Sequence, residues 1–175
     1  MSNVSQRGFT LYEILIYLTL FLVLSVLIVG LVVQLLAGGF RAARSREVVS
    51  SVTVAFDALI RETKFAQRVY GPTSVFASNA SQLSLQSAQS PPAGEAVTFV
   101  DFYLDTGRIF MKRESENPLA LTGERVFVDR FRVTRLNPVP ASDALRIGIE
   151  AHHRLARQSQ DETFAATTTI TLRGY

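Results

Sequence analysis

The chain contains no cysteine among its 175 residues, and its only histidines are the neighbours His152 and His153. Without cysteine, neither a disulfide framework nor a thiolate site can form. Adjacent residues of a strand point to opposite faces, so the two histidines cannot jointly hold a metal. The sequence also has no P-loop, no Gly-x-Gly-x-x-Gly and no Gly-x-Ser-x-Gly segment. We therefore predict a protein that is not an enzyme and that uses no cofactor and no metal.

Charge is absent from residues 14–37, which are almost entirely apolar. An apolar run of 18 or more residues is long enough to cross hydrocarbon as a helix, so residues 11–37 are the predicted transmembrane segment. Glu13 stands directly before the run. An unpaired carboxylate that enters hydrocarbon costs on the order of a few kcal/mol. Its position therefore predicts a specific partner for Glu13.

The residues ahead of this run form a recognisable motif. A short polar leader ends in Gly8, and Phe-Thr-Leu-Tyr-Glu follows at residues 9–13. This pattern resembles the class III signal of type IV pilin-like proteins. The resemblance implies that prepilin peptidase removes residues 1–8 by cleaving between Gly8 and Phe9, and that the new amino terminus of Phe9 is methylated. It also implies that Glu13 pairs with the terminal amine of Phe9 in a neighbouring subunit during filament assembly.

Two other kinds of segment share some of these features. A secretory signal peptide has its apolar core before the cleavage site, whereas here the Gly8 site comes first. A plain single-pass anchor needs the apolar run but has no use for Gly8 or Glu13. The alternative to a filament subunit is therefore a membrane-anchored binding or adhesion domain that does not polymerise.

Beyond the run, the pattern is that of an amphipathic helix. Apolar residues recur at helical spacing, and charged residues occupy the other faces. The predicted stripe consists of Val48, Val49, Val52, Ala55, Phe56, Leu59 and Ala66. We predict one long helix over residues 9–70, closed by Gly71-Pro72 because proline cannot continue a helix. Gly30 and the Gly38-Gly39 pair mark where it could bend or loosen.

Residues 71–175 predict a globular head rich in β-strands. The pattern changes to period two, with short runs at residues 74–77 and 82–85 and longer strands at 125–136, 144–152 and 164–173. Asp105-Thr106-Gly107 lies between two apolar segments and predicts a hairpin turn. The expected fold class is α+β, with the long helix packed on an antiparallel sheet that has one covered face.

The head bears a second, looser resemblance, over residues 97–175, to minor pilins and to minor pseudopilins of type II secretion. It rests on the order of these segments: Tyr103-Leu104-Asp105, Pro118-Leu119, Val126-Phe127-Val128, Ile147 and Ile149, and Thr169-Ile170-Thr171-Leu172-Arg173. Many major pilins close a loop with a disulfide, which this chain cannot do. Tip-most pseudopilins typically lack the acid found here at Glu13. The resemblance therefore implies a minor pilin or pseudopilin, and leaves open a pilus, a competence system or type II secretion.

The same resemblance implies the partners and the location of the chain. Its partners would be the prepilin peptidase, other pilin or pseudopilin subunits, and the assembly platform and ATPase of the same system. The chain would cross the inner membrane once, with its head exported, and would then join a periplasmic or cell-surface filament. The positive-inside rule points the other way, because Arg41, Arg44 and Arg46 follow the span and only Arg7 precedes it.

Charged side chains of the head offer two further candidates. The net charge of +3 falls to +2 once Arg7 leaves with the leader. A basic surface that could contact DNA phosphates comprises Arg108, Lys112, Arg113, Arg125, Arg130, Arg132, Arg135, Arg146, Arg154 and Arg157. Interspersed acids favour a charge-mixed solvated face over a DNA site. Asp101, Asp105 and Asp129 could supply oxygen ligands to calcium, but a turn role for Asp105 and solvated positions for the others are favoured.

Overall fold

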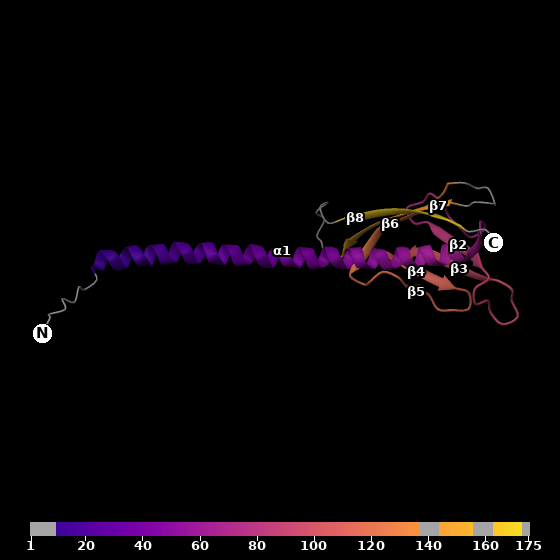
Figure 1. The fold of residues 1–175 in the computed structure, drawn as a ribbon, viewed down its shortest axis with the longest axis horizontal. Helices are drawn as coiled ribbons and strands as arrows, with labels where there is room; N and C mark the ends of the chain where they lie inside the picture. The colour runs from indigo at the N-terminus through magenta and orange to yellow at the C-terminus, as the bar shows by residue number, and fades with distance from the viewer. Residues whose placement is uncertain (1–9, 137–143, 156–162, 173–175) are drawn as a thin grey trace. The chain divides into compact units, whose positions relative to one another are not determined.

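The computed structural model describes residues 10–136, 144–155 and 163–172. Within these residues the chain forms one α-helix and eight β-strands (Figure 1). It divides into two compact units, Met1–Ala43 and Arg44–Tyr175. The helix α1, Leu11–Phe65, contributes to both units, which are described separately below.

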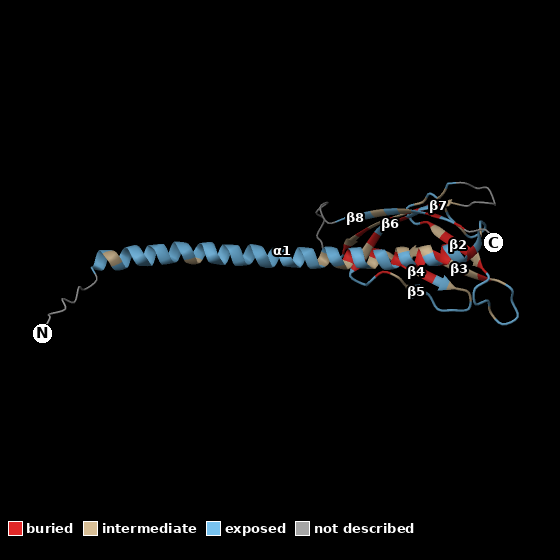
Figure 2. Cartoon of the chain, in the orientation of Figure 1, coloured by how far each residue is buried: buried red, intermediate tan, exposed pale blue. Residues whose placement is uncertain are grey.

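The first unit contains the apolar part of α1. Its large apolar side chains are all exposed, from 46% for Ile16 to 83% for Leu11, and Figure 2 shows this part of the helix in the colour of exposed residues. The segment has a mean hydropathy of 2.9 over its most apolar 18 residues and is long and apolar enough to cross a membrane. The hydroxyl of Thr19 donates to the backbone carbonyl of Ile16 at 2.8 Å, so this polar group is satisfied within the helix.

The second unit contains the amphipathic part of α1. Val48, Val52, Ala55 and Leu59 are buried at the spacing of one helical face, as predicted. Val49 departs from the predicted stripe because it is 37% exposed. The charged residues Asp57, Arg61 and Lys64 are exposed on the other faces. The stripe therefore packs against the sheets of this unit.

The helix ends earlier than predicted, at Phe65 rather than at residue 70. The next four residues form strand β1, Ala66–Val69, which pairs antiparallel with β2, Gln82–Ser87. The hydroxyl of Ser87 donates to the carbonyl of Phe65 at 3.3 Å and so satisfies one carbonyl of the last helical turn. A strand partner thus replaces the helical hydrogen bonds of residues 66–69. Gly71-Pro72 follows this strand instead of closing the helix.

The predicted single sheet is in fact two antiparallel sheets. The first has the order β1-β2-β3-β4-β5, and the second has the order β6-β7-β8. The remaining bounds are β3 Thr98–Asp105, β4 Arg108–Arg113, β5 Leu119–Ala120, β6 Val126–Arg135, β7 Ala144–His153 and β8 Phe164–Thr171. The predicted strands at 82–85, 125–136, 144–152 and 164–173 are confirmed over the residues that the structure describes. The run at 74–77 contributes only a bridge between Val75 and Gln82.

The predicted hairpin turn joins β3 to β4. Asp105 pairs with Arg108, which leaves Thr106 and Gly107 as a two-residue loop. Both have positive φ angles, 48° and 74°, as the favoured hairpin turns of this length require. The backbone N–H of Val128 donates to the carbonyl of Gly107 at 2.8 Å, so the turn is also fixed to β6 of the second sheet.

One apolar core holds the second unit together. It joins helix residues such as Leu59 to fully buried side chains of both sheets, among them Phe102 and Phe131. Each fully buried large apolar side chain contributes roughly 1.5–3 kcal/mol relative to exposure. Residues 77–81 link the sheets, because Ser81 donates its backbone N–H to the carbonyl of Phe131 at 2.9 Å.

Candidate functional site

The predicted processing site lies at the start of the chain. Gly8 and Phe9 are outside the described residues, so cleavage between them stays a prediction. The described part begins at Thr10, and α1 begins at Leu11. The residue that the sequence predicts for assembly, Glu13, lies in the first helical turn.

Thr10 caps this helix. The backbone N–H of Glu13 donates to the Thr10 hydroxyl at 3.3 Å and to its carbonyl at 3.1 Å. A Thr at the cap with a Glu three residues later is the pattern of a capping box, in which a carboxylate or amide side chain favours the helix start. The sequence analysis did not predict the Thr10 cap, although Thr-x-x-Glu before an apolar run is its signal. Glu13 can therefore support the helix start as well as a contact with another molecule.

The apolar surface that follows Glu13 has no cover in the first unit. None of the side chains in its most apolar window is buried. The helix continues through Gly30, Gly38 and Gly39, and a Cβ at any of them would meet no atom within 4 Å. Such a surface can be covered by lipid, by the helices of other subunits, or by both in turn.

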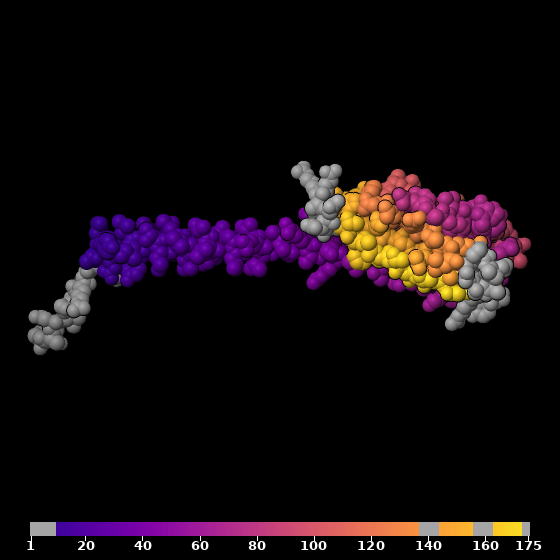
Figure 3. All heavy atoms as spheres, turned by 90° about the horizontal axis from the view of Figure 1, so that it is seen from above, coloured from indigo at the N-terminus to yellow at the C-terminus, as the bar shows by residue number. Residues whose placement is uncertain are grey.

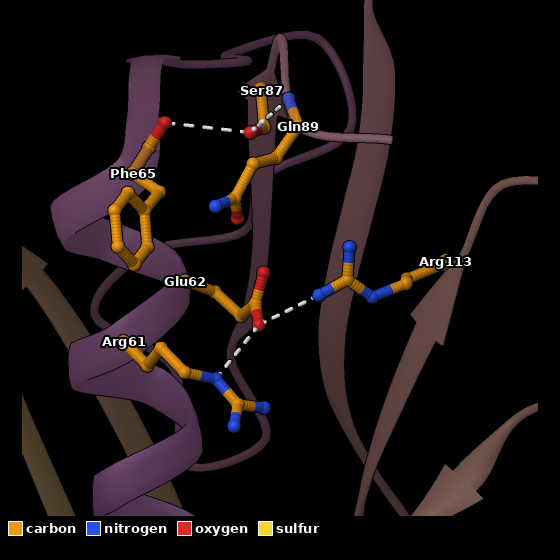
Figure 4. A network of polar contacts seen from close by, with 6 residues as sticks. All are labelled: Arg61, Glu62, Phe65, Ser87, Gln89 and Arg113. Carbon is orange, nitrogen blue, oxygen red and sulfur yellow. Dashed lines mark hydrogen bonds and ion pairs between the residues drawn. The ribbon is translucent and has the colours of Figure 1, made fainter. Parts of the chain in front are cut away.

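A buried ion pair lies where α1 meets the first sheet. Glu62 is only 3% exposed, and its carboxylate accepts hydrogen bonds from Arg113 of β4 at 2.7 Å and from Arg61 at 3.3 Å (Figure 4). Sequence reasoning missed this contact. The available signal was an acid at a position of the apolar stripe, three residues after Leu59.

The two histidines lie on opposite faces of β7, as predicted. His152 Nδ1 lies 2.7 Å from a carboxylate oxygen of Asp129 on the partly exposed face. The side chain of His153 is 5% exposed, and its Nε2 lies 3.3 Å from Glu47 of α1. Its other ring nitrogen accepts the backbone N–H of Leu155 at 3.2 Å. Each ring therefore has its own carboxylate partner.

The three aspartates considered as calcium ligands have separate surroundings. Asp101 lies opposite Lys112 in the hairpin of β3 and β4, and Asp105 lies at the turn of that hairpin. Asp129 contacts His152. Among the residues that the structure describes, no group of three or more acidic or histidine side chains is placed to hold a metal ion.

The basic side chains of the head mostly have local partners. Arg113 binds Glu62, Arg130 binds Glu150 at 2.8 Å, and Arg108 donates to the carbonyl of Thr122 at 3.0 Å. The guanidinium group of Arg154 lies over the ring of Phe127, 5.7 Å from its centre. Arg157 is outside the described residues. Arg132 and Arg146 are exposed and have no ion-pair partner among the residues that the structure describes, so contact of the head with DNA stays a prediction.

Two features of the chain bear on function. The first is an exposed apolar helix with one carboxylate at its start, and the second is a folded α+β head. Protein-family models, curated proteins and solved structures were compared with the chain, and none matched. The layout of a long N-terminal apolar helix with antiparallel sheets packed on its amphipathic part is nevertheless that of pilin-like proteins.

Proposed function

We propose that the chain is a minor pilin or pseudopilin, a structural subunit of a type IV pilus-like or type II secretion filament. The observation that carries this proposal is the single acidic residue at the start of α1, followed by a long exposed apolar surface. Glu13 is the only charged residue of the helix before Arg41, and the apolar side chains between them are exposed. The Gly8-Phe9 pair ahead of them supports processing by prepilin peptidase at the cytoplasmic face of the inner membrane.

The proposed mechanism is the packing of helices. In a bilayer, apolar side chains gain little from exchanging lipid for another apolar helix, so they give assembly little direction by themselves. A carboxylate at the edge of hydrocarbon does give direction, because neutralising it with an opposite charge removes an unfavourable burial. The free amine of Phe9 on a neighbouring subunit would supply that charge. The apolar helices would then form the filament core, with the heads exported outside it.

The second candidate is a membrane-anchored binding domain that never polymerises. The specific observation in its favour is the group Arg41, Arg44 and Arg46, which follows the apolar run directly. Under the positive-inside rule these charges favour a cytoplasmic head. Such a protein would need no cleavage after Gly8 and no partner for Glu13.

The test is mass spectrometry of the amino terminus in the native host, with and without its prepilin peptidase. The filament proposal expects a chain that starts at N-methylated Phe9 only when the peptidase is present. A chain that retains residues 1–8 in both strains would overturn it and leave the anchored domain. Protease accessibility of the head from the periplasmic side distinguishes the two orientations in the same cells.

A further inference from the structure

The second sheet has one edge that no described residue covers. Strand β8 lies at the end of the order β6-β7-β8, and within the described part of the chain it pairs only with β7. The opposite edge, β6, is covered in part by residues 77–81, which form backbone hydrogen bonds with Phe131 and Val133. The two edges of this sheet are therefore not equivalent.

The free edge lacks the features that usually protect one. Its sequence, Phe-Ala-Ala-Thr-Thr-Thr-Ile-Thr, is eight residues long and contains no proline and no charge. Exposed edges are normally kept from pairing by charged residues, proline, bulges or short length. An uncharged edge of this length is suited to accept another strand.

A basic hollow of about 220 Å³ lies beside this edge, on the outer face of the second sheet. In Figure 3, the yellow atoms of β8 border the orange atoms of β7 on the surface that faces the reader. The hollow is lined by residues of all three strands, among them Arg130, Arg132, Arg146, Gly148, Glu150 and Thr167. Gly148 has no side chain and pairs with Arg132 on one side and Thr167 on the other, which leaves space between the arginines.

The hollow carries positive charge that no acidic side chain of the described residues compensates. Arg130 is neutralised by Glu150 at 2.8 Å, whereas Arg132 and Arg146 are exposed and have no ion-pair partner in the described ranges. The register places Arg146 opposite Thr134, so Arg132 and Arg146 are diagonal neighbours on adjacent strands. Two guanidinium groups in this arrangement suit a carboxylate, which they can bind through parallel N–H donors.

From these two features we propose that β8 and the arginine hollow together form a docking surface for an extended acidic segment of a partner protein. The segment adds to β8 as a further strand and places a carboxylate side chain at Arg132 and Arg146. An added strand lies about 5 Å beyond β8 and presents alternate side chains to the outer face. Arg146 of β7 pairs with Thr169 of β8, so a glutamate next to Thr169 on that face is two strands from Arg146 and within reach of its long side chain. Arg132 of β6 lies one strand further away and adds positive charge to the same hollow.

A nucleic-acid ligand fits this surface less well. Arg130 is held by Glu150, so only Arg132 and Arg146 of the hollow are left to contact phosphates, which is few for a row of them. A phosphodiester can accept from the unpaired N–H groups of β8 but cannot donate to its C=O groups, whereas a peptide backbone pairs with both. Only residues of the head form this docking surface, so it can bind a partner whether or not the chain polymerises through Glu13.

The test is site-specific photocrosslinking of the full chain in its native host. Thr169 is exposed on β8 next to Arg146, and it is replaced by a photoreactive phenylalanine analogue; Glu116, exposed on the turn after β4, is the control site. We expect protein adducts from position 169 that map to a segment with aspartate or glutamate at alternate positions. The double variant R132Q/R146Q should reduce the adduct about tenfold, since charge-assisted hydrogen bonds are lost.

The matched control is K112Q/R125Q, which removes the same charge from exposed positions outside the hollow. It should leave the adduct unchanged. The proposal is overturned if position 169 gives no more protein adduct than position 116, or if the captured segment is not acidic. It is equally overturned if R132Q/R146Q has no effect beyond the control, or if the adducts are nucleic acid or lipid.

Discussion

Glu62 of α1 and Arg113 of β4 form an ion pair of 2.7 Å in which the carboxylate is 3% exposed and the arginine 21% exposed. This contact joins the amphipathic half of the helix to the first sheet across 51 residues of sequence. Removing one partner of a buried pair leaves the other charge without compensation, which costs more than the pair itself gains. The pair therefore makes the docking of sheet and helix sensitive to a single charge.

Glu62→Gln keeps the shape of the side chain and removes its charge. We expect it to lower the free energy of unfolding of the head by about 2 kcal/mol, because Arg113 loses its counterion in a mostly buried position. The measurement is urea unfolding of the detergent-solubilised chain, followed by circular dichroism in the strand region.

Asp57→Asn is the control for this change, since Asp57 is exposed on the same helix. Its effect should stay within about 0.5 kcal/mol. Combining Glu62→Gln with Arg113→Gln should cost less than the sum of the single changes, because both charges are then gone. Equal effects of Glu62→Gln and Asp57→Asn would show that the pair does not stabilise the head.

Gly107 links the two sheets through its lack of a side chain. Its φ of 74° is strained for other residues, and a Cβ at this position would overlap the ring of Phe127. Gly94 has a similar φ of 89°, but a Cβ there would meet nothing within 4 Å. Gly107→Ala should therefore cost about 1–3 kcal/mol more than Gly94→Ala, because it adds overpacking to the same backbone strain.

Thermal unfolding of both variants measures this difference. Adding Phe127→Leu to Gly107→Ala should recover part of the loss by shortening the opposing side chain. Equal melting temperatures for Gly107→Ala and Gly94→Ala would mean that the turn can move away from Phe127 at no cost.

Much of the head was predictable because one face of each strand is buried. In β7, buried residues alternate with half-buried or exposed ones along the whole strand, and this period of two is visible in the sequence. The same rule failed for Ala66–Val69, where the two polar residues between Ala66 and Val69 also fit a helical period. Alternation reveals which residues face the core but not which strands are neighbours. The division into two sheets therefore could not be predicted.

The candidate sites were predictable to different degrees. The position of Glu13 before a charge-free run is a local pattern, so the sequence analysis could identify it. The partner of Glu62 is 51 residues away and depends on how the helix packs on β4. The arginine hollow depends on the register that sets Gly148 between Arg132 and Thr167, which no local pattern encodes.

Gly30 allows a direct test of where the helix can loosen. A Cβ at this position meets no atom within 4 Å, so Gly30→Ala introduces no clash. The change should stabilise the local helix by about 1 kcal/mol. Amide exchange around residue 30 in detergent micelles should then slow about fivefold. Gly71→Ala, at a turn that follows β1, is the control and should leave exchange at residue 30 unchanged. Unaltered exchange in Gly30→Ala would exclude Gly30 as a weak point of the helix.

Glu13 is the residue on which the proposed filament function can be separated from a purely local role. Glu13→Gln keeps a side chain that can complete the capping box with Thr10 but removes the charge, whereas Glu13→Ala removes both. If Glu13 pairs with the amine of Phe9 on a neighbour, both variants should be cleaved and inserted normally. Both should also lose at least about tenfold in filament yield, because neither can neutralise that amine.

The measurement is the amount of the chain in sheared or crosslinked filament fractions, normalised to its amount in the membrane. If Glu13 acts only at the helix start, Glu13→Gln should assemble like the unmodified chain and only Glu13→Ala should be impaired, by the modest loss that a missing cap causes. Wild-type yield for Glu13→Gln would therefore contradict the charge-pairing mechanism. The contrast between the two variants decides the point because they share the cleavage site, the apolar run and the head.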